Sequence, residues 1–230
     1  MIYKTDIGDL HCLCCRGKES NRRIAYILYP MEDMLTCWIG QAAERYGVTI
    51  VVVTGMDWQN VFSPWPAKGV PKGSPDFKGE SPEFLLTLRR DIIPKLEQAL
   101  GTGDSPERTL VGVSMSGLFA LWQWMKCDSF ENIASLSGSF WYEGFMEWMR
   151  SRPVPHKSGR AFFLLGEQEP KSRTKAFDCV GTNTSAIVEM LENDGIDVRF
   201  ESVPGNHYSD PIPRLDKAFS ALFDNNVTSK

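Results

Sequence analysis

The sequence predicts an α/β fold, a doubly wound and mostly parallel sheet with helices on both faces. Short apolar runs alternate with helical patterns along the whole chain. The run VTIVVVT at residues 48–54 is β-branched on both faces, which is typical of a parallel strand covered on each side. No repeat, low-complexity tract or linker divides the chain, so we expect one domain over residues 1–230.

The elements follow in a regular order. One or two edge strands are expected within residues 2–15, around a turn at residues 7–9. The remaining expected strands are residues 24–29, 48–54, 109–113, 133–136, 161–165 and 198–203. The expected helices are residues 35–46, 84–100, 118–125, 185–193 and 212–223. Gly47 closes the first helix, Pro94 kinks the second, and residues 55–82 form a long loop of the kind that is usually functional.

The composition of the chain indicates which kinds of molecule it binds. The formal net charge is -4 and no stripe of Lys and Arg is present, which argues against nucleic acid. No apolar stretch approaches the ~20 residues of a membrane span, and the N-terminus lacks the layout of a signal peptide. We therefore expect a cytoplasmic protein that acts on a small molecule, and we leave a homo-oligomer open.

The six cysteines do not indicate a disulfide framework or a metal site. Cys14 and Cys15 are adjacent on an expected strand, so their side chains point to opposite faces. The spacing of ligands in zinc sites is absent. We expect reduced thiols and no bound metal.

The segment Gly112–Gly117 carries the strongest chemical signal. A strand ends at Val113 and a helix begins near Ser116, which is the sharp turn on which esterases expose a nucleophilic serine. Ser114 is the expected nucleophile. Ser116 stands where the G-x-S-x-G pattern has its second glycine, and a turn with a helix-capping serine is the alternative interpretation.

A serine hydroxyl needs a base, and the chain has three histidines, His11, His156 and His207. In this arrangement the histidine follows the last strand, and His207 lies between the last expected strand and the last expected helix. His207 is therefore the expected base. A histidine that only orders its loop is the alternative.

An acid is expected after the strand at residues 161–165. Glu169 is the first choice, Glu167 the reserve and Asp178 a more distant candidate. A dyad of serine and histidine alone stays open.

Two backbone N–H groups should form an oxyanion hole. Met115 follows the nucleophile at a helix N-terminus, where negative charge is favoured. The second donor should follow the strand at residues 24–29. Pro30 has no N–H, so Met31 is the expected donor and Glu32 the alternative.

With these residues in place, the chain resembles the putative-esterase family of the α/β-hydrolase fold, which includes esterase D, feruloyl esterases and enterochelin esterases. The similarity extends over residues 24–223. It is carried by Trp65-Pro66, Phe77-Lys-Gly79, Glu83-Phe84-Leu85, Ile92-Ile93-Pro94, the serine turn, Ser137-Gly-Ser-Phe-Trp141, Gly166 with Glu169, and Gly205-x-His207. The resemblance implies serine-dependent ester hydrolysis without a metal or organic cofactor.

The expected function is hydrolysis of a carboxylic ester through an acyl-enzyme on Ser114. Trp65 and Trp141 are the expected substrate-binding residues, because aromatic walls suit a flat acyl group. Cover of the core is the alternative for both. A carbohydrate-linked ester is another candidate substrate, and a siderophore ranks lower because no cluster of Arg and Lys is present to receive an anionic iron complex. An acyltransferase and a non-catalytic binding module on the same fold stay open.

Overall fold

The computed structural model of the protein describes residues 2–17, 22–31, 33–103, 105–153, 158–172 and 174–224. Over these residues the main sheet has eight strands, in the order β1-β2-β4-β3-β7-β8-β9-β10. The pairs β1–β2 and β2–β4 are antiparallel, and the other five pairs are parallel. The expected mostly parallel, doubly wound α/β sheet is confirmed.

The strands of the main sheet are β1 (Ile2–Ile7), β2 (Leu10–Cys15), β3 (Arg23–Leu28), β4 (Thr49–Thr54), β7 (Glu107–Val113), β8 (Asn132–Leu136), β9 (Arg160–Gly166) and β10 (Asp197–Val203). The helices are α1 (Thr36–Tyr46), α2 (Trp58–Val61), α3 (Ser81–Thr87), α4 (Ile93–Leu100), α5 (Met115–Trp124), α6 (Phe145–Arg150), α7 (Val180–Asn193) and α8 (Pro211–Phe223).

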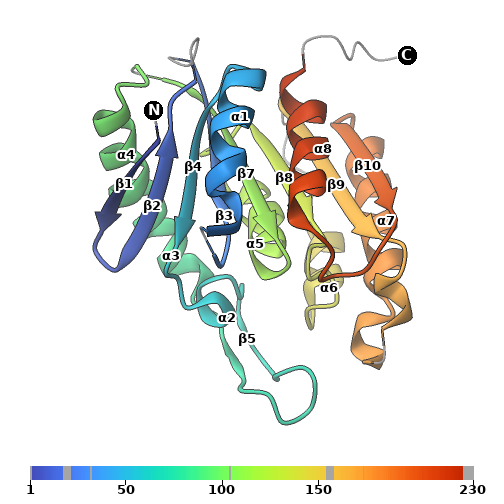
Figure 1. Ribbon diagram of the computed structural model, residues 1–230. Helices are drawn as coiled ribbons and strands as arrows, with labels where there is room; N and C mark the ends of the chain where they lie inside the picture. Colours follow the sequence, from blue (N-terminus) through green and yellow to red (C-terminus); the bar gives the residue numbers. More distant parts are fainter. Residues whose placement is uncertain are drawn as a thin grey trace.

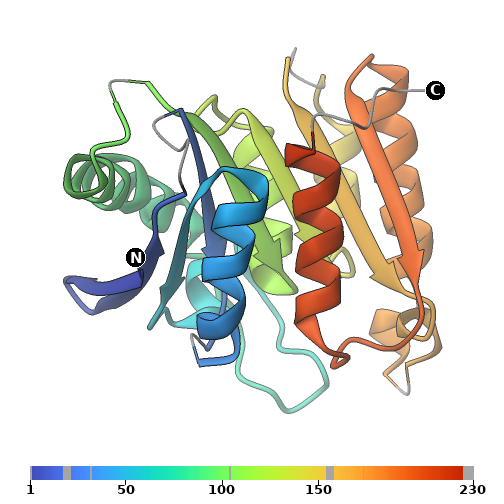
Figure 2. The same ribbon diagram turned by 45° about the horizontal axis from the view of Figure 1, so that its top comes forward.

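Helices cover both faces of the sheet, as Figures 1 and 2 show. Helices α1 and α8 pack together on one face, and α5 and α7 pack on the other with α3 and α4 beside them. Each face has its own apolar cluster, because alternate residues of a strand point to opposite sides. Every residue of β4 is buried, as its continuous β-branched run predicts.

The antiparallel N-terminal strands separate the cysteines as expected. Cys12 and Cys14 belong to one apolar cluster, whereas Cys15 belongs to the cluster on the opposite face. None of the six cysteines, all of which lie in the described residues, forms a disulfide. Within the described ranges, no three His, Cys, Asp or Glu side chains gather as a metal site would require.

The helix expected over residues 84–100 is two helices joined by a π-helical turn at Leu88–Ile92. Pro94 lacks an N–H and its ring conflicts with the carbonyl four residues earlier. In the wider π-helical turn the Ile93 N–H donates to the Leu88 carbonyl. This turn accommodates the proline without interrupting the helical segment.

The long segment at residues 55–82 has structure of its own. It contains α2 and a two-stranded ribbon of β5 (Pro66–Ala67) and β6 (Phe77–Lys78). Figure 1 shows this segment extending below the lower edge of the sheet, the edge at which the parallel strands end. Over the described residues, no helix is both long enough and apolar enough to cross a membrane.

Candidate active site

Ser114 lies on a strained turn between β7 and α5. Its backbone has φ 57° and ψ -120°, a left-handed region that side chains other than glycine rarely adopt. Such a conformation costs about 1–3 kcal/mol and is found mainly at functional sites. Gly112 makes the turn possible, because a Cβ there would lie 2.1 Å from the Ser116 carbonyl oxygen.

Ser116, the departure from the G-x-S-x-G pattern, is accommodated by hydrogen bonds. Its fully buried hydroxyl accepts from the Val113 N–H at 2.7 Å and lies 2.9 Å from the Leu28 carbonyl oxygen, to which it donates. The close packing expected at this position falls instead on Gly117, where a Cβ would lie 2.8 Å from the Ser135 hydroxyl.

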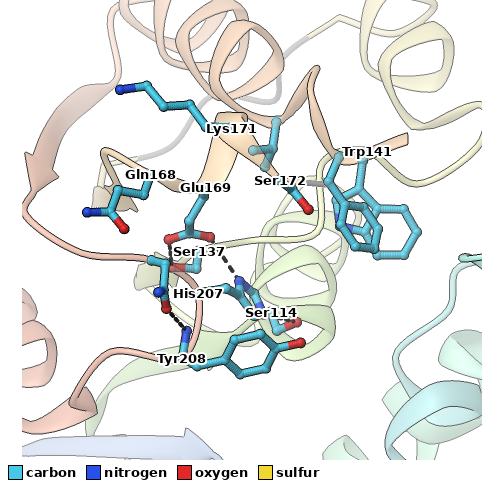
Figure 3. A pocket seen from close by; sticks show the side chains of 12 residues that line it. Ser114, Ser137, Trp141, Gln168, Glu169, Lys171, Ser172, His207 and Tyr208 are labelled. Atoms are coloured by element: carbon cyan, nitrogen blue, oxygen red, sulfur yellow. Dashed lines mark hydrogen bonds and ion pairs between the residues drawn. The ribbon is translucent and has the colours of Figure 1, made fainter. Parts of the chain in front are cut away.

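The structure brings Ser114, His207 and Glu169 together in one hydrogen-bonded chain (Figure 3). The Ser114 Oγ lies 3.0 Å from the His207 Nε2, and the His207 Nδ1 lies 2.9 Å from the Glu169 Oε2. Serine follows β7, glutamate follows β9 and histidine follows β10. The three meet because these strands are parallel and end at the same edge of the sheet.

Glu169 is held as a buried carboxylate. Its side chain is 4% exposed, and its Oε1 accepts hydrogen bonds from the Ser137 hydroxyl at 2.6 Å and the Gly166 N–H at 2.7 Å. Burial alone would raise the pKa of Glu169. Hydrogen bonds from His207, Ser137 and Gly166 outweigh burial and hold that pKa below its usual value.

The other carboxylates considered for the acid position are elsewhere. Glu167 and Asp178 are exposed, whereas Glu169 is bonded to the histidine. His11 lies on β2, between β1 and β4 in the sheet, where it is hydrogen-bonded to Asp6. His156 and Glu32 lie outside the described residues.

Three further residues of the site were missed by sequence reasoning. Arg214, in the first turn of α8, is buried and forms an ion pair with Glu169 at 3.2 Å. Ser137 has φ 53°, and the Ser139 hydroxyl lies 3.3 Å from that of Ser114. The sequence did contain a signal for Arg214. A cation in the first turn of a helix is unfavourable because it opposes the helix dipole, so such a residue indicates a contact elsewhere.

The two expected oxyanion donors lie at the start of α5 and beyond the end of β3. Met115 is the first residue of α5, at the end of the helix where N–H groups lack intrahelical partners. Met31 follows β3 and is 54% exposed. The bond between Ser116 and the Leu28 carbonyl ties the end of β3 to the turn.

A cavity of about 890 Å³ opens beside Ser114. Trp141 and Phe177 form one wall with ring centroids 4.8 Å apart, and Tyr208, 93% exposed, stands at the rim next to His207. The full lining is Ser114, Ser137, Trp141, Gln168, Glu169, Lys171, Ser172, Phe177, Val180, Asn206, His207 and Tyr208.

Trp65, the other expected substrate-binding residue, does not line this cavity. Its indole N–H donates to the Glu143 carbonyl at 2.9 Å, and its ring packs against Tyr142, Phe145 and Trp148. The structure therefore separates the two tryptophans: Trp141 faces the cavity, whereas Trp65 fixes the ribbon-bearing segment to α6.

A serine on a strained strand-to-helix turn at the carboxyl edge of this sheet defines the class of α/β-hydrolases. A sequence profile of the family described as "Putative esterase" matches residues 33–218. The match covers most of the chain, so the protein belongs to this family.

Individual relatives are distant. The uncharacterised protein YbbA of Bacillus subtilis (strain 168) is 26% identical over 159 residues, which cover 67% of this chain and 64% of YbbA. The match thus spans less than two thirds of that relative's length.

Solved structures share the fold. An IroE-like serine hydrolase from Shewanella oneidensis superposes with a TM-score of 0.78 at 16% identity, covering 96% of this chain and 77% of the other. The siderophore hydrolase EstB from Aspergillus nidulans gives a TM-score of 0.75 at 14% identity, covering 100% and 96% of the two chains. At these identities the likeness establishes the α/β-hydrolase fold alone.

Proposed function

We propose that this protein hydrolyses a carboxylic ester through an acyl-enzyme on Ser114, with His207 as general base and Glu169 as the acid of a catalytic triad. The observation that carries the proposal is the hydrogen-bonded chain from the Ser114 hydroxyl through both ring nitrogens of His207 to Glu169. A binding module on a hydrolase fold has no need of a base within 3.0 Å of a strained serine.

In the acylation step, the Ser114 Oγ attacks the ester carbonyl carbon as the His207 Nε2 takes its proton. The tetrahedral intermediate collapses, and the same proton passes from His207 to the departing alkoxide, which leaves as the alcohol. His207 then takes a proton from water, the hydroxide attacks the acyl carbon, and the acid leaves as the Ser114 Oγ regains a proton. Glu169 stabilises the imidazolium that forms in both steps.

The developing oxyanion is assigned to the N–H groups of Met115 and Met31. The N-terminus of α5 adds the favourable end of its helix dipole at the same place. Loss of one such donor typically lowers the rate by ~10²–10³-fold.

The cavity supports an aromatic acyl group as the substrate class. Trp141 and Phe177 present ring faces and edges to a flat group, and Ser172 and Gln168 offer hydrogen bonds to substituents. A carbohydrate-linked ester, such as one carrying a hydroxycinnamoyl group, combines both features.

Siderophore esters form a second candidate class, because several structures of this fold are described as siderophore hydrolases. This class ranks lower here. Among the described lining residues, Lys171 is the one cation besides a protonatable histidine, and Figure 3 shows its side chain extending away from Ser114.

A fluorophosphonate probe tests the mechanism without knowledge of the substrate. We expect stoichiometric labelling of Ser114, found by intact mass and peptide mapping, and its loss in Ser114→Ala and His207→Ala. A well-folded wild-type protein that is not labelled would overturn the proposal. If labelling succeeds, p-nitrophenyl, feruloyl and catecholate esters should be screened with and without an added alcohol, because an ester product with that alcohol would identify an acyltransferase.

A further inference from the structure

Arg214 contacts three different parts of the site from the first turn of α8. Its Nη1 donates to the Ser137 hydroxyl at 2.6 Å and lies 3.2 Å from the Glu169 Oε1. Its Nη2 donates to the Asn206 carbonyl at 2.6 Å. One planar guanidinium thus bonds the turn after β8, the acid loop after β9 and the residue immediately before His207.

The two oxygens of the Glu169 carboxylate have different hydrogen-bond partners. The Oε1 faces Ser137, the Gly166 N–H and Arg214, whereas the Oε2 faces the His207 Nδ1. Three donors on one oxygen prevent the carboxylate from rotating. The other oxygen is therefore kept in line with the imidazole.

The surrounding backbone leaves room for this guanidinium. A Cβ on Gly166 would lie 2.9 Å from both the Arg214 Nη2 and the Glu169 Oε1, and 2.7 Å from the Gly205 carbonyl oxygen. The acid loop and the histidine loop are also joined directly, since the Gln168 N–H donates to the Gly205 carbonyl at 3.0 Å. The two loops can converge on Arg214 because residue 166 has no side chain.

Placing Arg214 here is unfavourable for the helix itself. The side chain is only 8% exposed, and a cation near a helix N-terminus opposes the helix dipole. The helix already has a cap, because the Asp210 carboxylate accepts from the Ile212 N–H. The position of Arg214 is thus explained by what it contacts in the site and not by the needs of α8.

We propose that Arg214 is a positioning residue that sets the relative placement of Glu169 and His207. It keeps the Glu169 carboxylate in line with the His207 imidazole. This inference rests on the proposed function, because positioning matters only if His207 activates Ser114. It predicts effects on the chemical step and on its pH dependence, with little effect on binding of a ligand in the cavity, which Arg214 does not line.

The pH effect has a definite sign. Removing the Arg214 cation, which lies 3.2 Å from the Glu169 Oε1, destabilises the ionised form of this buried carboxylate. Glu169 then becomes neutral at a higher pH, so the acidic limb of a rate profile moves to higher pH. Other described charged or titratable groups nearby include Asp210, in the segment between β10 and α8, and Tyr29, beyond the end of β3. Lys171 and Tyr208 line the cavity together with Glu169 and His207.

The test measures inactivation by a fluorophosphonate across pH, resolved into the maximal rate constant kinact and the half-saturating concentration KI. Three variants are compared with the wild type: Arg214→Gln, Arg214→Lys and Arg108→Gln. Arg108 is a matched control, because it pairs with Glu97 at 2.6 Å near the amino end of β7, at the opposite edge of the sheet. Thermal unfolding gives the folded fraction of each variant.

We expect Arg214→Gln to lower kinact by about 10²-fold at neutral pH, the lower end of what positioned acid–base groups contribute, with KI nearly unchanged. Its acidic limb moves to higher pH. Arg214→Lys keeps the charge but cannot hold three oxygens with a planar fork, so we expect an intermediate kinact and an acidic limb near the wild-type position. Arg108→Gln lowers stability and leaves kinact and the limb unchanged.

A folded Arg214→Gln with wild-type kinact and an unshifted limb overturns this inference while the proposed function stands. If Arg214→Gln does not fold, Arg214→Lys decides the question, and wild-type kinact in that variant overturns the inference. Absence of labelling in the wild-type protein overturns both, because a positioning role presupposes a reactive serine.

Discussion

The Ser116 hydroxyl joins the serine turn to the end of β3 through the Leu28 carbonyl, 2.9 Å away. The same oxygen accepts the Val113 N–H, so one small buried side chain satisfies backbone groups on both sides of the turn. The loop expected to supply an oxyanion donor is thereby fixed to the turn that carries the nucleophile.

Replacing Ser116 with alanine should lower stability more than reactivity. The Val113 N–H loses its partner in the interior, which costs about 1–3 kcal/mol. Urea unfolding monitored by circular dichroism measures the change, and probe labelling of Ser114 should persist. An unchanged unfolding midpoint would contradict the role given to this hydroxyl.

Ser114→Gly should be more stable than Ser114→Ala, by about 1 kcal/mol, because glycine adopts φ 57° without strain whereas alanine keeps the Cβ. Both variants lose labelling. Thermal unfolding of the pair isolates the backbone term, since neither retains the hydroxyl. Equal stability would show that the turn is not strained in solution.

Glu169→Gln should destabilise the protein by about 3 kcal/mol at neutral pH, because it leaves the buried Arg214 without an anion. The pKa of Glu169 is lowered in the folded state, so its stabilising contribution is present above the ordinary carboxyl pKa and is lost as the pH falls through the folded value. The difference between wild type and variant should therefore shrink in acid. Urea unfolding at several pH values checks this, and a difference that grows in acid would contradict it.

The two tryptophans should respond differently to truncation. Trp141→Ala opens the cavity wall, so we expect a higher KM for aromatic esters with a smaller change for p-nitrophenyl acetate. Trp65→Ala removes packing against Tyr142, Phe145 and Trp148, and we expect about 3 kcal/mol of destabilisation with no selective effect on aromatic substrates. Steady-state kinetics and thermal unfolding of both variants separate the roles, and a selective loss in Trp65→Ala would reverse them.

Met31 tests the oxyanion assignment through its backbone. Met31→Pro removes the N–H and should lower the rate by ~10²–10³-fold, whereas Met31→Ala keeps the N–H and should retain activity. The side chain is 54% exposed, so neither change disturbs the core. Hydrolysis of p-nitrophenyl acetate provides the measurement, and equal rates in the two variants would assign the second donor elsewhere.

The sequence by itself predicted the sheet strands, most of the helices and the family. Each of these features has a local signature: the apolar run of β4, the glycine that ends α1, and the serine turn after β7. The order of strands then places Ser114, Glu169 and His207 at one edge, because parallel strands end together. Their hydrogen bonding could not be predicted, since it depends on distances between residues far apart in the chain.

The tertiary structure decided the remainder. Short elements such as α6, which packs against Trp65, have too weak a local pattern to be found in the sequence. The sequence predicted the same substrate-binding role for Trp65 and Trp141. Only their packing shows that Trp141 lines the cavity and Trp65 does not. Arg214 and Ser137 lie 77 residues apart and meet at Glu169 through contacts that no local pattern encodes. Periodicity and turn chemistry act over a few residues, whereas the environment that makes Glu169 a buried carboxylate exists only once the loops after β8, β9 and β10 have converged.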